Sequence, residues 1–375
     1  EDYGQTWELL TPGDNGLPAD YPVRVIREDT EKEGVLYAGT EFGLFISFDD
    51  GKNWNAFNNN LPVTPITDIK IHHDDLVMST MGRGFWILDN IISLRGLAEV
   101  KDEQAHLFEI KEGVRNRLYA RSAQNGPEYP RMGVTIDYYI KDEAEKVQLD
   151  ILDNEGQVVR TFVKGRPSPE VNTERDMSTE FSNPPAAGGL PAEKGFNRYN
   201  WNMRHAGGWS DNPRRAYMGN GPMISTGTFK ARLTVGDMIM EKPFDVVLDP
   251  RVTLVSDADV QAQEELALEI QLFSDDVSKL IAKIDEAREK LKNSLDTESA
   301  NRRQIRMKEQ LDQVYYKLVT PPGTYMQPML SSQTGYLSSM IGRADQRPGK
   351  DAYDRFEELK QRFEAIKAEF YELQD

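Results

Sequence analysis

The sequence predicts a multidomain protein with β-structure before α-structure: a partial β-propeller of about two blades, an Ig-like β-sandwich and a C-terminal helical bundle. Residues 1–255 hold short runs rich in Val, Ile, Phe, Tyr and Trp, separated by Gly, Asp, Asn and Pro, as in strands and turns. A Ser/Asp–Gly–Trp pattern recurs 47 positions along, from Asp2 to Asp49, a spacing close to one propeller blade. From Ser256 onward the apolar residues recur with a helical period. We therefore expect propeller blades at 1–90, a linker at 91–104, a sandwich at 105–255 and a bundle at 256–375.

Seven candidate strands fall in the first unit, each bounded by turn residues and rich in residue types that favour strands. They are Val23–Glu28, Val35–Thr40, Gly43–Phe48, Trp54–Phe57, Ile66–His72, Leu76–Thr80 and Phe85–Asp89. Short, evenly spaced strands are typical of a sandwich, a barrel or a propeller, and the repeat favours the propeller.

The repeat has an explanation in side-chain chemistry. Its complete copy runs from Ser47 to Trp54, and the copy before it, Asp2-Tyr3-Gly4-Gln5-Thr6-Trp7, lacks the first two positions. Ser and Asp side chains can accept hydrogen bonds from backbone N–H groups in a tight turn. Gly supplies a conformation that other residues resist, and Trp can anchor the turn on an apolar core. We therefore assign structural roles to Asp2, Gly4, Trp7, Ser47, Asp49, Gly51 and Trp54.

This pattern resembles the Asp-box, or BNR, motif. The segments Leu36–Phe45 and Gly82–Asp89 resemble the closing blades of sortilin-like and glycosyl-hydrolase-like BNR propellers, which commonly have His where this chain has Met81. The segments Pro321–Gly323 and Arg343–Gly349 resemble the tails of the same proteins, so the resemblance covers nearly the whole chain. The chain is thus similar to the C-terminal part of such a protein.

In that family the box joins the third and fourth strands of a blade. The resemblance therefore implies that Trp7–Thr11 ends one blade, that residues 23–57 form a whole blade, and that residues 66–89 supply three strands of another. A propeller ring needs roughly 4–8 blades. We therefore expect the N-terminal remainder of the propeller to lie in the same or another chain.

The second unit again has alternating apolar residues. Its candidate strands are Val134–Ile140, Val147–Leu152, Val158–Val163, Phe196–Met203, Thr228–Val235 and Met238–Leu248. A hairpin turn is expected at Asp153–Gly156. Tyr199 and Trp201 alternate within one strand, so we expect both to face the sandwich core.

The sequence predicts three or four helices in the third unit, residues 256–375. A helix begins after a Ser256 cap, and further helices are expected near 298–318, 331–342 and 352–373. Leu266, Ile270, Phe273 and Val277 form part of the apolar stripe of the first helix.

Three residues are candidates for ligand contact. Arg83 lies between two glycines, where its guanidinium could bind a carboxylate or a sugar acid, or else pair with a nearby acid in a structural turn. Trp209 and Arg214 belong to a basic and aromatic loop that could form a binding surface or pack locally. Adjacent residues of a strand point to opposite faces, so His72 and His73 indicate a strand-end turn and not a shared metal site. We identify no catalytic, cofactor-binding or metal-binding residues.

The amino-acid composition excludes some chemistry and disfavours some classes of binding partner. The chain has no cysteine, which excludes disulfides and thiolate chemistry, and its net charge of −17 disfavours nucleic acid and anionic membranes. No apolar run is long enough to span a membrane.

The resemblance implies a non-catalytic, exported or cell-surface binding or assembly protein whose propeller recognises a protein or a glycan. Sortilin-like relatives hold peptide ligands in the propeller. The alternative is the C-terminal part of a propeller glycoside hydrolase, because Asp-box propellers include sialidases and endoglucanases. A third reading is a structural subunit of a surface assembly, which should copurify with a companion chain.

Overall fold

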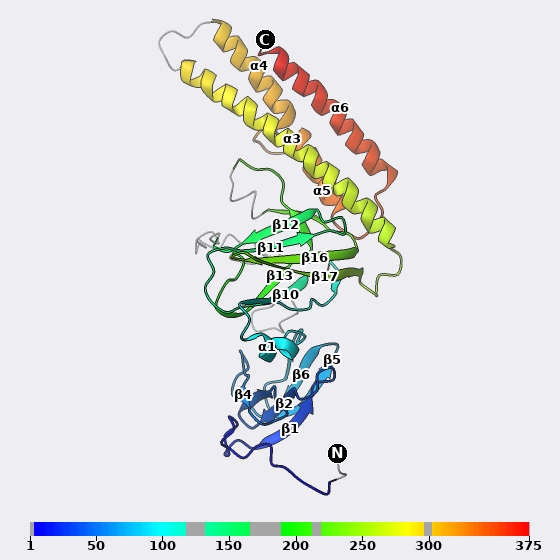
Figure 1. The fold of residues 1–375 in the computed structure, drawn as a ribbon. Helices are drawn as coiled ribbons and strands as arrows, with labels where there is room; N and C mark the ends of the chain where they lie inside the picture. The colour runs from blue at the N-terminus through cyan, green and yellow to red at the C-terminus, as the bar shows by residue number, and fades with distance from the viewer. Residues whose placement is uncertain (1–3, 118–131, 166–188, 212–218, 296–301, 375) are drawn as a thin grey trace.

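The computed structural model describes residues 4–117, 132–165, 189–211, 219–295 and 302–374. Small sheets lie at the N-terminal end of the molecule, larger sheets in the middle and long helices at the C-terminal end (Figure 1). The expectation of a mixed β and α protein with a helical C-terminal region is confirmed. None of the helices in these ranges combines the length and apolar character that a membrane span requires.

The N-terminal part consists of two antiparallel sheets that pack together, with strand orders β1-β2-β3-β4 and β5-β6-β7. The strands are β1 Val23–Glu28, β2 Leu36–Thr40, β3 Gly43–Ser47, β4 Asn55–Ala56, β5 Ile66–His72, β6 Asp75–Thr80 and β7 Phe85–Leu88. Buried side chains of both sheets, among them Tyr37 and Ile66, form one hydrophobic cluster. Arg27 on β1 also connects them, because its Nε donates to the Ile69 carbonyl at 3.1 Å and its Nη2 lies 2.7 Å from Asp68.

The segment 91–104, expected as a linker, contains the short helix α1 (Leu94–Val100). Arg95 on α1 lies 2.9 Å from the buried carboxylate of Asp29 and 2.7 Å from Asp74, so α1 is held to the N-terminal sheets. Arg198 holds the other side, since it pairs with Asp137 at 2.8 Å and donates to the Asn90 carbonyl. Charge-assisted hydrogen bonds thus continue from the N-terminal sheets into the middle part.

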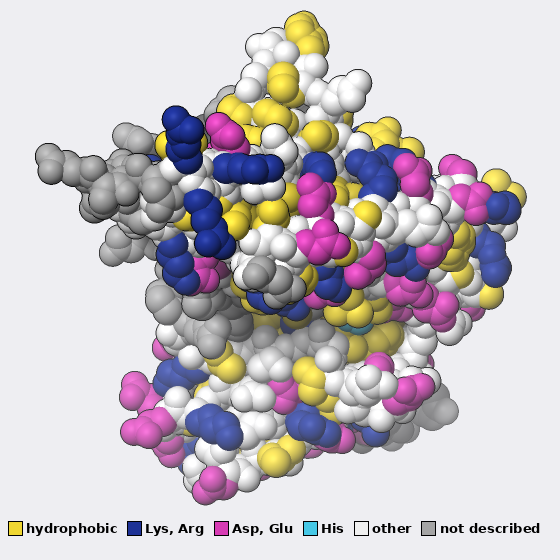
Figure 2. Space-filling view, turned by 90° about the horizontal axis from the view of Figure 1, so that it is seen from above, with side chains coloured by type: hydrophobic (Ala, Val, Ile, Leu, Met, Phe, Trp, Pro, Cys, Tyr) yellow, Lys and Arg dark blue, Asp and Glu magenta, His cyan; other side chains and the backbone are white. Residues whose placement is uncertain are grey.

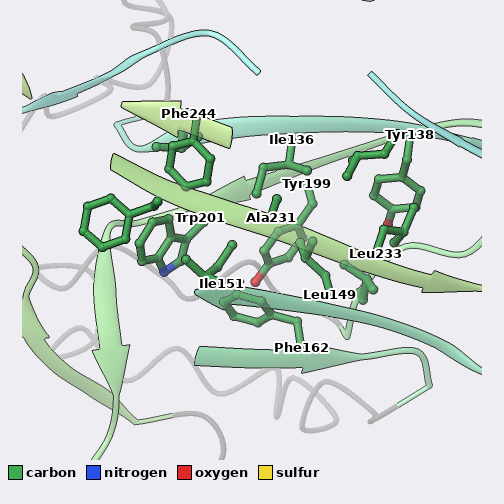
Figure 3. Packing of buried hydrophobic residues seen from close by; sticks show 14 of the residues in the cluster. Ile136, Tyr138, Leu149, Ile151, Phe162, Tyr199, Trp201, Ala231, Leu233 and Phe244 are labelled. Carbon is green, nitrogen blue, oxygen red and sulfur yellow. The ribbon is translucent and has the colours of Figure 1, made fainter. Parts of the chain in front are cut away.

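The middle part contains a three-stranded and a five-stranded sheet, with orders β13-β10-β8 and β12-β11-β16-β17-β9. The strands are β8 Ala105–Leu107, β9 Gly113–Arg115, β10 Val134–Ile140, β11 Val147–Leu152, β12 Val158–Val163, β13 Gly195–Trp201, β16 Gly227–Val235 and β17 Met238–Leu248. A separate ribbon pairs β14 (Arg204–Ala206) with β15 (Asn220–Met223). One hydrophobic cluster takes side chains from both sheets, and Tyr199 and Trp201 are buried in it as predicted (Figure 3).

Four helices form the C-terminal part: α3 Asp257–Leu295, α4 Arg302–Leu318, α5 Leu330–Ile341 and α6 Lys350–Glu372. Apolar residues from all four, including Ile270, Val314, Leu337 and Phe363, share one cluster. The stripe predicted on the first helix is buried there, because an amphipathic helix is stabilised mainly by the packing of its apolar face.

Buried polar contacts fix the first turns of α3 to the middle sheets. Gln263 accepts hydrogen bonds from Arg115 at 2.8 Å and Arg117 at 3.2 Å. The next residue, Glu264, accepts a hydrogen bond from the Ser225 backbone at 2.8 Å and lies 2.5 Å from His205. Burial raises the pKa of the Glu264 carboxyl, but these hydrogen bonds outweigh burial and hold the pKa below its ordinary value.

Candidate binding surface

The Ser47–Trp54 turn adopts the geometry that its residue types predict. Ser47 Oγ accepts a hydrogen bond from the Gly51 backbone at 2.9 Å, and Asp49 Oδ1 accepts one from the Asn53 backbone at 2.8 Å. Gly51 has a φ of +81°, which disfavours residues with a side chain. Burial raises the pKa of the Asp49 carboxyl, but the hydrogen bonds from Asn53 and Ser47 outweigh it and lower the pKa. Every hydrogen bond named here closes the turn, so the Asp49 carboxylate is a structural group.

Trp54 anchors this turn on the four-stranded sheet. Its side chain is 3% exposed and packs with Leu36, Ala38 and Phe45 of β2 and β3. Its Nε1 donates to the Leu10 carbonyl at 2.9 Å. The indole therefore fastens the segment before β1 to the end of β3.

The first copy of the pattern does not behave in this way: the strand expected at Trp7–Thr11 is absent, while the structural roles of Asp2, Gly4 and Trp7 stay predictions. Trp7 is 90% exposed and its Nε1 bonds only locally, to the Gly4 carbonyl at 3.1 Å. Trp7–Thr11 is not a strand, because no strand in the described residues lies beside it to complete a ladder. Asp2 lies outside the described residues. The difference between the two Trp residues is that Trp54 packs against a sheet and Trp7 has no described sheet beside it.

Arg83 is at the tip of the turn between β6 and β7. Gly82 and Gly84 have φ values of +86° and +72°, and Thr80 Oγ1 donates to the Gly84 carbonyl at 2.7 Å. The Trp86 indole also donates to the Arg83 carbonyl at 3.1 Å. The turn is thus structural, but within the described ranges no acid lies at salt-bridge distance from Arg83, whose side chain is exposed.

Beside Arg83, β7 presents an apolar face to solvent. Phe85 and Ile87 point to the same side of the strand and are 81% and 58% exposed, while Trp86 and Leu88 pack against the shared cluster. The β7 edge opposite β6 has no partner among the strands that the structure describes. The exposure of this face was not predicted from the sequence. A strand that is apolar on both sides is the signal that indicates it.

The other predicted contact residues lie elsewhere. The Trp209 backbone donates to Asp275 on α3 at 2.7 Å, and its ring is partly exposed. Burial raises the pKa of that Asp275 carboxyl. Arg214 falls outside the described residues. Figure 1 places α3 and the N-terminal sheets on opposite sides of the middle sheets, so Arg83 and Trp209 do not form one site.

The two adjacent histidines form a tight hairpin, as expected, although their rings do not point apart. His72 pairs with Asp75 across the hairpin, and the central residues His73 and Asp74 have φ values of +50° and +61°. Because His73 is in the turn and not in the strand, strand alternation does not apply, and the two ring centroids lie 4.1 Å apart. Across the part of the chain that the structure describes, no group of three or more His, Asp or Glu could hold a metal ion.

Comparison of the sequence with models of known protein families and with curated proteins finds no match.

Proposed function

We propose that this chain is a non-catalytic binding and assembly protein, and that its N-terminal sheets are consecutive blades of an Asp-box propeller completed by further blades. The observation that carries the proposal is the uncovered apolar face and free edge of β7. The four-stranded sheet ends in a fourth strand, β4, which follows the Ser47–Trp54 turn, whereas the next sheet stops at three strands. A sheet edge with unpaired backbone groups favours addition of another strand.

Two exposed side chains on β7 would gain free energy from being covered. Covering Phe85 and Ile87 would contribute roughly 2–5 kcal/mol together, since full burial of one such side chain contributes about 1.5–3 kcal/mol. The shared cluster between the two N-terminal sheets gives a precedent within the chain for sheet faces that pack on each other. Arg83, exposed at the rim of the same face, could pair with a carboxylate of the covering segment or of a ligand.

The middle part is proposed to be an Ig-like accessory domain. In Ig-like sandwiches the strands A, B and E lie in one sheet and C, F and G in the other. With β9 and β12 left out of the numbering, β8, β10 and β13 match A, B and E in one sheet, and β11, β16 and β17 match C, F and G in the other; β9 and β12 also belong to this second sheet. A buried aromatic core supports the same interpretation, because Trp201 contacts Phe229 and Phe244 at centroid distances of 6.2 and 6.1 Å, and these two rings also contact each other at 6.0 Å.

Photocrosslinking tests the proposal. Ile87→p-benzoylphenylalanine in the natural protein is expected to crosslink to a segment that carries another Ser-x-Asp-x-Gly-x-x-Trp pattern, in the same or a companion polypeptide. The matched control is Ile239→p-benzoylphenylalanine on β17, a similarly exposed strand position. Crosslinks from position 87 that carry no such pattern, or that equal those from position 239, would refute the proposal. If the natural protein hydrolyses a glycan, the binding proposal is wrong and the alternative, a propeller glycoside hydrolase, takes its place.

A further inference from the structure

A cavity of about 670 Å³ opens between α5, α6 and the connection that joins them. It is separate from β7, because the middle sheets lie between α5 and the N-terminal sheets (Figure 1). A cavity of this size and a mostly apolar lining are typical of ligand sites. The lining residues are Gln263, Pro328, Ser332, Gln333, Tyr336, Leu337, Met340, Ile341, Gln346, Pro348, Gly349, Asp351, Ala352 and Arg355.

The longest wall is one face of α5. Pairs of lining residues begin at Ser332, Tyr336 and Met340, so three successive helical turns face the cavity. At 1.5 Å per residue this wall is roughly 14 Å long, which matches two to three turns of a second helix. Leu337 and Ile341 are buried at its base, while Tyr336 and Met340 are exposed at its rim. A flexible Met beside an aromatic ring suits an apolar helix face.

The lining includes two charged residues, Arg355 and Asp351, and the first of them is engaged. Gln333 Oε1 accepts hydrogen bonds from Arg355 at 2.8 Å and from Arg362 at 2.6 Å. Arg355 also pairs with Glu358 at 2.5 Å, so its charge is compensated. Asp351, in the first turn of α6, is the charged lining residue whose side chain has no ion pair or hydrogen bond within the described ranges.

The connection between α5 and α6, residues 342–349, is bound to two arginines of the middle part. Asp345 pairs with Arg115 at 3.1 Å and with Arg117, and Arg117 also donates to the Gly342 carbonyl. A wall fixed before binding lowers the entropy lost when a ligand docks. The cavity is therefore preorganised by the middle sheets.

We propose that this cavity binds a basic, amphipathic helix of a partner protein, with apolar side chains on the α5 wall and a Lys or Arg beside Asp351. Charge complementarity favours this occupant, because the side-chain charge left unpaired among the described lining residues, that of Asp351, is acidic and the whole chain carries −17. The neighbouring cations Arg347 and Lys350 already pair with Asp259 and Asp354. On the face seen in Figure 2, acidic and basic side chains are interspersed.

Fluorescence anisotropy with a fluorescein-labelled peptide of Leu-Lys-Lys-Leu repeats tests the affinity. Tyr336→Ser is expected to weaken binding about tenfold or more, and Asp351→Asn roughly three- to tenfold. Leu272→Ser and Glu269→Gln, both at exposed positions on α3, are the matched controls for lost apolar area and lost charge. A Leu-Glu-Glu-Leu peptide should bind at least tenfold more weakly.

Methyl NMR of the methionines locates the peptide independently of affinity. The Met340 methyl signal should shift on titration, whereas Met238, exposed to a similar degree on β17, should not. Equal affinities of Tyr336→Ser and Leu272→Ser, or a shift of Met238 without Met340, would overturn the proposal. A dimer of the protein alone that Tyr336→Ser dissociates would also overturn it, since the occupant would then be a second copy.

Discussion

Asp345→Asn tests how strongly the helices depend on a buried ion pair. The Asp345 side chain is 9% exposed and lies 3.1 Å from Arg115, whose side chain is 0% exposed. Burial lowers the pKa of the Arg115 guanidinium to about 10 even with Asp345 present. Removing one partner of such a pair leaves an uncompensated charge in a dry site. The free energy of unfolding should therefore fall by about 3–5 kcal/mol.

A double-mutant cycle separates the pair from its surroundings. Arg115→Met removes the stranded charge, so the double variant should cost at least about 1 kcal/mol less than the sum of the two single variants. The control pair is Lys317 and Glu369, which lie closer together, at 2.5 Å, but are 46% and 41% exposed. Solvent screening should keep its coupling energy below about 1 kcal/mol.

Urea unfolding followed by far-ultraviolet circular dichroism measures each corner of the cycle. If burial decides, the coupling energy should be larger for Arg115–Asp345, the pair with the longer distance. If distance alone decides, it should be larger for Lys317–Glu369. The reasoning is wrong if Asp345→Asn costs less than about 1 kcal/mol, or if the Lys317–Glu369 coupling is the larger.

Three further outcomes follow from the contacts described. Trp54→Ala should lower the free energy of unfolding of the N-terminal sheets by about 3–5 kcal/mol, and Trp7→Ala by less than about 0.5 kcal/mol, in calorimetry; equal effects would contradict the assignment. Gly51→Ala forces a side chain into a positive-φ position and should cost about 1–2 kcal/mol in the same measurement. Glu264 has a lowered folded-state pKa, so its contribution is complete above its unfolded pKa of about 4.3 and is lost as pH falls through the folded value. Glu264→Gln should flatten the stability profile in that acidic window, and an unchanged profile would refute this.

The sequence predicts an element well where its pattern is local. The ranges of β10, β11, β12 and β17 follow from alternation and turn residues, and α3 begins directly after Ser256 as the capping residues indicate. Strands β8, β9, β14 and β15 were not predicted, because strands of three or four residues are specified by the partners they meet and not by their own pattern. The strand expected at Trp7–Thr11 is absent for the same reason, and the Trp7 ring is exposed because no described sheet lies beside it.

Some features of the candidate sites could likewise be predicted from the sequence, and others could not. The glycines that flank Arg83 indicate its turn from sequence alone. The exposure of Phe85 cannot be predicted from sequence, because it depends on whether another segment covers β7. The cavity beside Tyr336 depends on the path of the connection after α5, which is fixed by the distant Arg115.

Helix α3 has a mechanical consequence. Its first half is attached to the middle sheets through Gln263, Glu264 and Asp275, whereas the residues after Asp275 extend for roughly 30 Å beyond the last of these attachments. No glycine or proline interrupts α3, so it lacks the usual causes of a kink. Force applied at the far tip would therefore reach the base as torque, and the helix would act as a stiff lever with its fulcrum at Asp275.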